Sequence, residues 1–130
     1  VDIARDPRWG RIVEGAGEDT FLGSKIAYAR VRGFQGDDYS ADDRILACAK
    51  HFVAYGAAEG GRDYNTTDMS EQRLREVYFP PFKAAVDAGV GSFMTSFNSL
   101  NGTPATAHPF LWKTVLRNEW KSQALVVTDY

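Results

Sequence analysis

The sequence has very little of several features, and each shortage excludes a class of protein. Its 130 residues include a single cysteine, Cys48, so no internal disulfide and no thiolate metal cluster can form. Fifteen basic residues against seventeen acidic ones give a net charge of −2, which lacks the positive field that recruits nucleic acid. No apolar run approaches the roughly 18 residues that span a bilayer. We therefore expect no nucleic-acid partner and no membrane span.

The motifs of several enzyme classes are also missing. The glycine-rich stretch from residue 56 lacks the Gly-Lys-Ser/Thr ending of a phosphate loop, and no Gly-x-Ser-x-Gly elbow or Cys/His pairing supports acyl transfer. The two histidines, His51 and His108, do not have the spacing of metal ligands. We expect no metal and no cofactor.

The composition that remains is that of an ordinary globular domain, with 44% hydrophobic and 25% charged residues. The single cysteine lies in an apolar stretch and is expected to be a small buried hydrophobe. The chain opens without Met and stops at Val-Val-Thr-Asp-Tyr, in what reads as the end of a strand. We expect it to be an internal piece of a longer protein.

Three segments have the spacing of helices. Residues 18 to 34 place Leu22, Ile26 and Ala29 at helical intervals. A second helix is expected to begin at a Ser70 cap and to be kinked or divided by Pro80 and Pro81. A third opens at residues 108–109 and turns three apolar side chains inward, namely Leu111, Val115 and Leu116.

Short apolar runs between these helices are expected to be strands. They are residues 1–4, 45–49, 92–97 and 124–128. A β-α-β-α-β-α-β order indicates an α/β fold with parallel strands, as in a doubly wound sheet or a (β/α)8 barrel, and spacing alone does not separate the two. In both, the ligand lies at the carboxyl edge of the sheet. The polar residues that follow the four strands are expected to meet there: residues 5–11, Lys50-His51, Asn98 and Asp129.

Asp129 is the candidate nucleophile, because its carboxylate ends an otherwise apolar strand with little water around it. A carboxylate that caps the next helix is the alternative. Lys50 and His51 are adjacent, so in a regular strand only one would face the site. Lys50 could bind a hydroxyl or stabilise a carboxylate, whereas His51 could be a ligand, a base or a hydrogen-bonded core histidine.

Residues 5–11 (RDPRWGR) combine three guanidinium groups with an indole. Trp9 offers a flat face on which a sugar ring can stack, and arginine offers forked donors for hydroxyls. The alternative is an internal Asp6–Arg8 pair with a packed Trp9. Residues 56 to 69 are expected to form a long loop at the rim.

Six motifs together resemble the N-terminal barrel of glycoside hydrolase family three, and most strongly its bacterial exported β-glucosidases. In order they are RDPRWGR from Arg5, GED from Gly17, KHF from Lys50, GGRDYN from Gly60, FNSLNG from Phe97 and TDY from Thr128. The resemblance implies about half of a (β/α)8 TIM-type barrel, an α/β sandwich domain after residue 130, a retaining mechanism and a periplasmic or secreted location.

The resemblance also implies roles for single residues. It makes Asp129 the nucleophile that forms a covalent glycosyl-enzyme, and places Tyr130 beside it in the substrate site. Arg11, Lys50 and His51 match the family's sugar binders, and Arg62 would support the same pocket. Phe97 falls where some members carry a tyrosine, so that hydroxyl would be missing.

A retaining mechanism needs a second carboxylate, which in these β-glucosidases is a glutamate in the following domain. The β-N-acetylglucosaminidase branch uses a further histidine instead, and this chain reads Val53-Ala54-Tyr55 where that branch continues its motif. The sequence thus predicts a β-glucosidase, with β-xylosidase or α-arabinosidase activity as the nearest rival. The 130-residue piece by itself could instead be an inactive carbohydrate-binding fragment.

Overall fold

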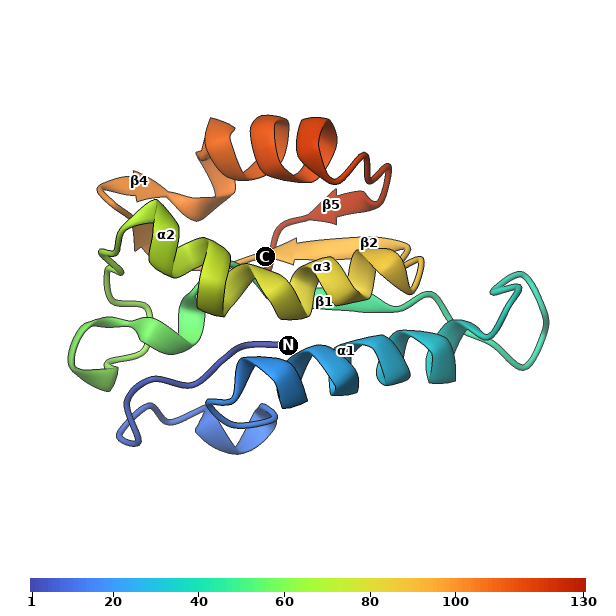
Figure 1. Cartoon of the computed structure of the whole chain (residues 1–130), viewed down its shortest axis with the longest axis horizontal. Coiled ribbons are helices and arrows are strands. Elements are labelled where there is room, and N and C mark those ends of the chain that lie inside the picture. The colour runs from blue at the N-terminus through green and yellow to red at the C-terminus, as the bar shows by residue number, and fades with distance from the viewer.

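The computed structural model describes residues 1–130, in which helices and strands alternate along the chain (Figure 1). In chain order the elements, with η for short 3₁₀ or π-helical segments, are η1 (Ile12–Glu14), α1 (Thr20–Gln35), β1 (Cys48–Phe52), η2 (Tyr55–Ala57), η3 (Glu59–Gly61), α2 (Glu71–Arg73), η4 (Leu74–Tyr78), α3 (Phe79–Asp87), β2 (Ser92–Thr95), β3 (Ser99–Leu100), β4 (Thr103–Pro104), η5 (Ala105–Ala107), η6 (Phe110–Glu119) and β5 (Leu125–Val127). None of the helices combines the length and apolar character that crossing a bilayer requires.

The centre of the fold is a three-stranded parallel sheet in the order β1-β2-β5, so the order across this sheet follows the order along the chain. Ala49, Phe93 and Val126 form one row across the sheet and pack into the core. Alternate residues point to the other face. The predicted α/β fold with a parallel sheet is confirmed.

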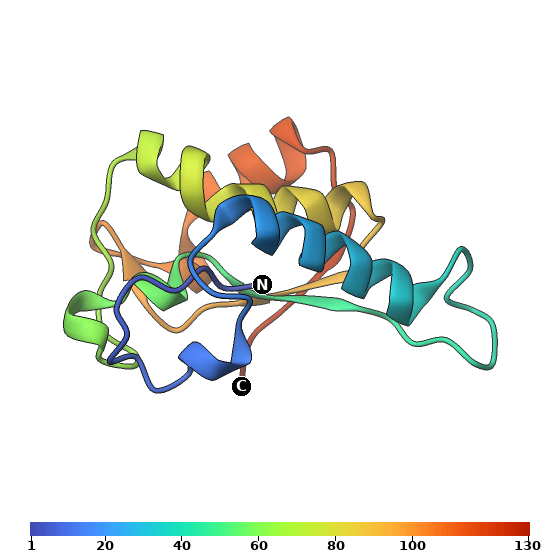
Figure 2. The ribbon, with the colours of Figure 1, turned by 60° about the horizontal axis from the view of Figure 1, so that its bottom comes forward.

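The long helices all lie on one side of this sheet. Seen with the bottom of the molecule turned forward, α1, α3 and η6 cover the upper face, and the N-terminal segment runs below (Figure 2). Helix α1 packs against α3, and α3 contacts β1. The lower face carries exposed side chains such as Cys48 and Leu125. The sheet is therefore covered on one face only.

Helix α1 is confirmed, but its buried face was not the one expected. Gly23, Ala27 and Val31 face the core, and Leu22 is 48% exposed. At Gly23 an added Cβ would touch the side chains of Ile3 and Pro81. The small residues let α1 lie close to α3, and helix–helix distance depends on the side chains at the contact.

Strand β1 was predicted three residues too early. The apolar pair Ile45 and Leu46 is exposed, and pairing with β2 begins at Cys48. The prediction that Cys48 is buried is wrong, because Ala49 takes the core-facing position and a shift by one residue reverses the faces of a strand.

Residues 1–4 do not form the predicted first strand, although they run beside β1. Val1 N donates to Lys50 O, and Ala4 N donates instead to Gly17 O at 3.0 Å. Two isolated hydrogen bonds with different partners do not make a ladder. Ile3 and Ala4 are nevertheless buried, so the segment belongs to the fold.

The second helix is divided as predicted. The Ser70 hydroxyl accepts from the backbone N–H of Arg73, and a π-helical segment, η4, separates α2 from α3, which has Pro80 and Pro81 in its first turn. The third helix, η6, is π-helical, with the expected side chains Leu111, Val115 and Leu116 turned inward.

Strand β2 ends at Thr95, and residues 99–104 form a hairpin with an Asn101-Gly102 turn in which both φ angles are positive.

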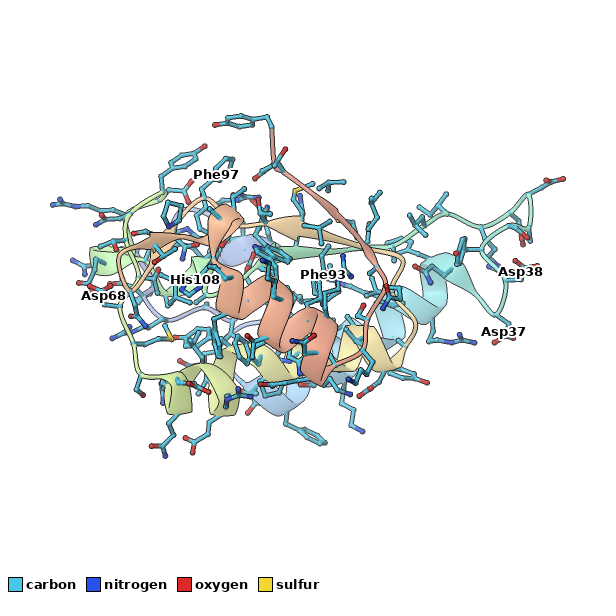
Figure 3. All side chains as sticks on the ribbon, turned by 90° about the horizontal axis from the view of Figure 1, so that it is seen from above. Asp37, Asp38, Asp68, Phe93, Phe97 and His108 are labelled. Atoms are coloured by element: carbon cyan, nitrogen blue, oxygen red, sulfur yellow. The ribbon has the colours of Figure 1, made fainter.

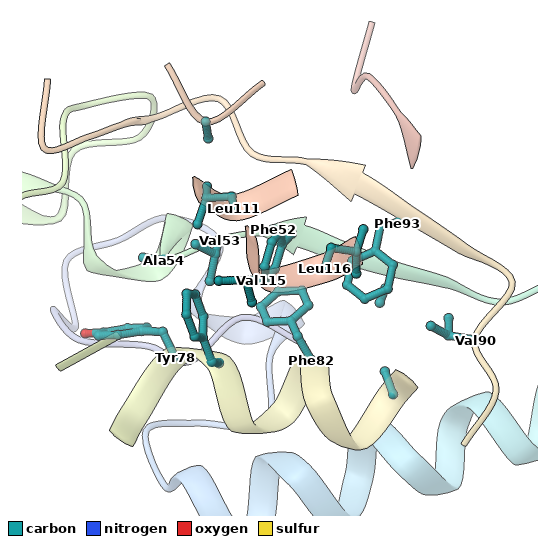
Figure 4. Packing of buried hydrophobic residues seen from close by; sticks show 14 of the residues in the cluster. Phe52, Val53, Ala54, Tyr78, Phe82, Val90, Phe93, Leu111, Val115 and Leu116 are labelled. Atoms are coloured by element: carbon teal, nitrogen blue, oxygen red, sulfur yellow. The ribbon is translucent and has the colours of Figure 1, made fainter. Parts of the chain in front are cut away.

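Phe52, the last residue of β1, lies at the centre of the core and is fully buried (Figure 4). Five aromatic rings surround it with centroid distances of 5.0–5.8 Å, those of Phe79, Phe82, Phe93, Trp112 and Trp120. These rings come from α3, β2 and the region of η6, so one side chain joins the sheet to two helices. The residue before it, His51, is thereby fixed in place.

Candidate functional site

The three parallel strands end at the same edge of the sheet, and three of the predicted site residues, Arg11, His51 and Asp129, meet there. Asp129 lies two positions after the end of β5, and its side chain is 20% exposed. Its Oδ2 atom lies 3.6 Å from Nε2 of His51 in β1, and a terminal nitrogen of Arg11 lies 3.4 Å from the same Nε2. Residues 11, 51 and 129 are thus brought together in space, as the sequence predicted.

His51 is held by a residue that the sequence analysis did not identify. Oδ2 of Asp2 lies 2.9 Å from Nδ1 of the His51 ring, and Oδ1 accepts from the His51 backbone N–H at 3.1 Å. The imidazole is 2% exposed. Asp2 was read as part of a strand, and nothing in the local pattern distinguished it. Of the three alternatives for His51, the hydrogen-bonded core histidine is confirmed, and the same ring lies beside Asp129 and Arg11.

Lys50 and His51 line one cavity, together with Asp2, Arg11 and Glu14. The expectation that only one of the adjacent pair would face the site holds for a regular strand, and here the pairing with β2 shifts register between Ala49 and Phe52. The peptide bond between them is cis, so the backbone is not that of a regular strand. Lys50 is exposed at the cavity, and its ammonium group forms no hydrogen bond within the chain.

Arg11 is fixed by Glu14 at the end of η1. Its Nε and a terminal nitrogen each donate at 2.9 Å to the two Glu14 oxygens. This pairing raises the pKa of Arg11 and lowers the pKa of Glu14. The guanidinium carbon also lies 5.5 Å from the centre of the Tyr55 ring. Both forked donors of Arg11 are therefore held in one orientation beside His51.

Trp9 is packed and is not free to stack on a sugar, so the second of the two alternatives for this segment is the one observed. It is 2% exposed, its Nε1–H donates to Asp63 Oδ1 at 2.9 Å, and its ring meets Tyr55 edge-on at 5.4 Å. Burial opposes the charged form of Asp63, but its donors outweigh burial and lower the pKa of that carboxyl. Asp6 and Arg8 form the pair that the same alternative named, with the Arg8 side chain exposed and that of Asp6 partly buried.

The Tyr55 ring contacts the rings of both Trp9 and His51. Its ring lies edge-on to His51 at 5.2 Å, and burial raises the pKa of its hydroxyl. The buried hydroxyl lies near Asp63 and Arg11 without hydrogen-bond geometry to either. The rings of Trp9, Tyr55 and His51 therefore form a packed wall behind the cavity.

The remaining predicted residues lie at the rim. Arg62 is exposed and does not line the cavity, so this chain does not bring it to the pocket. Tyr130 is 92% exposed, and its ring lies 5.0 Å from that of Phe97, which lies 4.8 Å from that of Tyr64. A row of three aromatic rings, exposed at its two ends and half-buried at Phe97, thus lies next to Asp129.

Figure 3 shows Phe97 at one end of the molecule and Asp37 and Asp38 at the other, on the loop after α1. The Asp-rich loop from residue 36 to 44 is therefore not part of this site. Residues 56–61 of the rim loop are largely buried, so the expected flexible rim is a packed segment there.

Gly56 is the point where this loop touches the N-terminal segment backbone to backbone. Its carbonyl oxygen accepts from Arg5 N at 3.0 Å, and an added Cβ would collide with the carbonyl oxygen of Ile3 and approach the Trp9 ring to 3.2 Å. We expect Gly56→Ala to lower the free energy of unfolding by about 1–3 kcal/mol, because overpacking moves backbone.

The displaced backbone lies next to Asp2 and Trp9, so activity should fall as well. Denaturant unfolding of the full-length protein measures the first effect. Gly33→Ala is the matched control, since nothing lies within 4 Å of its added Cβ on α1, and it should be neutral or stabilise by up to about 1 kcal/mol. Equal effects of the two substitutions would contradict the close contact.

Comparison with known proteins agrees with this arrangement. The model of the glycosyl hydrolase family 3 N-terminal domain matches residues 1–130, the whole of the chain. The chain belongs to glycosyl hydrolase family 3. The resemblance in the six motifs is thereby confirmed at the level of the family.

Individual relatives of this family 3 domain are glycosidases. The chain is 52% identical over 130 residues to a periplasmic β-glucosidase of Salmonella typhimurium, and the match covers 100% of this chain and 17% of the relative. It is 43% identical over 129 residues to a β-xylosidase of Formosa agariphila, covering 97% of this chain and 18% of the relative. The chain thus spans less than a fifth of either relative.

Solved structures of the family have the same local fold. A crystal structure of a β-glucosidase from Listeria innocua in complex with isofagomine superposes with a TM-score of 0.96 at 45% identity, over 99% of this chain and 18% of that one. The same enzyme in complex with glucose gives a TM-score of 0.96 over the same shares.

Proposed function

We propose that the full-length protein containing this domain is a retaining exo-acting β-glycosidase, and specifically a β-glucosidase that releases terminal glucose. The observation that carries the proposal is the meeting of Asp129, His51 and Arg11 at the carboxyl edge of a parallel sheet. The Salmonella relative is named a periplasmic β-glucosidase, and the Listeria enzyme was solved with glucose. Those names support glucose as the sugar and a periplasmic or secreted location.

The chemistry assigned to Asp129 is nucleophilic. Its carboxylate oxygen attacks the anomeric carbon, the bond to the aglycone oxygen breaks, and an acid elsewhere protonates that oxygen. Water then attacks the same carbon, transfers a proton to that residue and releases Asp129 with net retention. Arg11 and Lys50 would donate to the sugar hydroxyls, and His51 and Tyr130 would border the bound sugar.

The acid/base residue is assigned to a part of the protein beyond residue 130. The two carboxylates need to lie about 5–5.5 Å apart. The two carboxylates that line the cavity with Lys50 and His51, those of Asp2 and Glu14, are hydrogen-bonded to His51 and Arg11. We therefore expect the isolated 130-residue piece to be inactive.

The arrangement of the sheet supports a proposal for the fold of the whole domain. Consecutive parallel strands with helices on one face only are the arrangement of a barrel wall, in which the uncovered face lines the interior. We propose that residues 1–130 form about half of a (β/α)8 barrel, completed by other parts of the protein and followed by an α/β sandwich domain.

A mechanism-based label tests the nucleophile. A slow 2-deoxy-2-fluoro glucoside with a good leaving group should accumulate the glycosyl-enzyme of the full-length protein, and peptide mapping should locate the sugar on Asp129. A label on any other carboxylate would refute the assignment. Labelling should be abolished by prior saturation with a competitive sugar.

A second candidate is β-xylosidase or α-arabinosidase activity. It is supported by the β-xylosidase relative from Formosa and by a β-xylosidase/α-L-arabinofuranosidase of Medicago sativa that is 43% identical over 136 residues. Comparing kcat/KM on aryl β-glucoside, β-xyloside and α-arabinoside separates the candidates. A higher value on the pentosides would favour the second.

A further inference from the structure

Asp2 makes two contacts with one residue. Its Oδ1 accepts from the His51 backbone N–H at 3.1 Å, and its Oδ2 lies 2.9 Å from the ring Nδ1. The Asp2 side chain is 10% exposed and that of His51 is 2% exposed, so water competes little for either. An ionised carboxylate can only accept hydrogen bonds. Nδ1 of His51 must therefore carry the proton in this contact.

The other ring nitrogen faces a group of the opposite kind. A terminal nitrogen of Arg11 lies 3.4 Å from Nε2, and arginine can only donate. A proton on Nε2 would point at that cation. Oδ2 of Asp129 lies 3.6 Å away, beyond a normal hydrogen bond. The surroundings thus favour an unprotonated Nε2 whose lone pair faces the Arg11 donor.

Arg11 cannot easily turn away, because Glu14 holds it with two hydrogen bonds of 2.9 Å. The four side chains form a line in which each proton has a defined position: Asp2 accepts, His51 donates and accepts, Arg11 donates at both ends, and Glu14 accepts. A carboxylate stands at each end of the line. Asp2 is the member that selects which nitrogen of His51 is protonated.

We propose that Asp2 is a positioning residue for the glycosidase reaction: it holds His51 in the Nδ1–H tautomer, so that Nε2 accepts from Arg11 and orients that guanidinium toward the sugar site beside Asp129. The inference rests on the proposed function. An Nε2 that accepts from one N–H of Arg11 leaves the remaining guanidinium N–H groups to donate to sugar hydroxyls. The same tautomer keeps a ring N–H away from Asp129, whose attacking oxygen a donor would weaken.

Asp2→Asn removes this selection with little change of shape. The amide oxygen can keep the hydrogen bond from the His51 backbone, which turns the NH₂ group toward Nδ1. Nδ1 must then accept, and the proton moves to Nε2, where it faces Arg11 and Asp129. We expect kcat/KM of the full-length enzyme on an aryl β-glucoside to fall about 10- to 100-fold, the usual effect of removing the partner that orients a site histidine.

The direct readout is the tautomer itself. In protein labelled with ¹⁵N-histidine, with His51→Gln identifying the resonances, the wild type should show the pyrrole-type shift at Nδ1 and the pyridine-type shift at Nε2. Asp2→Asn should exchange the two, and Asp2→Glu, which keeps an acceptor-only group, should not. A purely structural role for Asp2 would leave the tautomer unchanged. Asp87→Asn, on the exposed surface of α3, is the matched control.

Two results would overturn the proposal. One is a wild-type His51 that carries its proton on Nε2, which needs no variant and so remains decisive if Asp2→Asn fails to fold. The other is an Asp2→Asn protein whose ring shifts and kcat/KM equal those of Asp87→Asn. Neither depends on the fluoroglucoside label, so a label away from Asp129 would refute the nucleophile while leaving the tautomer result to stand by itself.

Discussion

Asp129→Ala and Asp129→Asn should lower kcat of the full-length protein on an aryl β-glucoside by about 10⁴-fold or more, the scale on which loss of a catalytic nucleophile is felt. The substituted side chain cannot form the bond to the anomeric carbon, whereas Arg11 and His51 remain in place to bind the sugar. KM should therefore change much less than kcat. Steady-state kinetics on a substrate with a good leaving group measures both.

Azide gives this prediction a chemical signature. In Asp129→Ala the space left by the carboxylate admits azide, which can attack the anomeric carbon as the aglycone leaves. The product should be an α-glycosyl azide, of configuration opposite to the substrate, and its NMR spectrum identifies it. Asp87→Asn, which loses only an exposed ion pair with Lys83, should behave as the wild type. Asp129→Ala that retains normal turnover would end the assignment.

The location of this site could be predicted because it depends on topology more than on detail. Parallel strands end at one edge, so any correct assignment of the apolar runs brings residue 129 near the Lys50-His51 pair. The prediction survived an error of three residues in β1, because His51 lies at the edge in either case. The predicted Ser70 cap and the division at Pro80 also held, since both depend on strictly local chemistry.

The predictions that were wrong concern which side chains pack against one another. Leu22 and Ile26 have the stronger apolar pattern, but Gly23 and Ala27 face α3, because close approach of two helices rewards small side chains that a hydrophobicity pattern undervalues. Trp9 appeared suited to stacking on sugar, yet its indole N–H is used by Asp63, which lies 54 residues away in the sequence. No local pattern contains that partner.

Asp2 was missed for a related reason. Its role depends on a contact with His51, 49 residues later, and on the segment around it lying beside β1 without joining the sheet. When residues 1–4 are predicted to be a strand, nothing in that pattern marks Asp2 as a residue of the site. Side chains that hold other side chains in position are the part of a site least visible in sequence, because they need two unrelated segments to be placed first.

Phe52→Ala should lower the free energy of unfolding by about 3–5 kcal/mol, the usual range for a buried Phe that leaves a cavity. The side chain is fully buried, and the five aromatic rings around it come from different elements. Those rings cannot all move inward, because each belongs to another rigid segment. Phe52→Leu, which fills much of the volume, should cost less. Denaturant midpoints of the full-length protein measure both.

Phe21→Ala is the matched control, because Phe21 is 71% exposed on α1 and its removal leaves no cavity; it should change stability by no more than about 0.5 kcal/mol. Phe52 is also the direct neighbour of His51. The cavity should therefore loosen the ring that Asp2 and Arg11 position, and lower kcat/KM under conditions where the protein remains folded. If Phe52→Ala were no more destabilising than Phe21→Ala, the aromatic cluster would not be what fixes the end of β1, and the rigidity of the site would have to come from Asp2 and Arg11 alone.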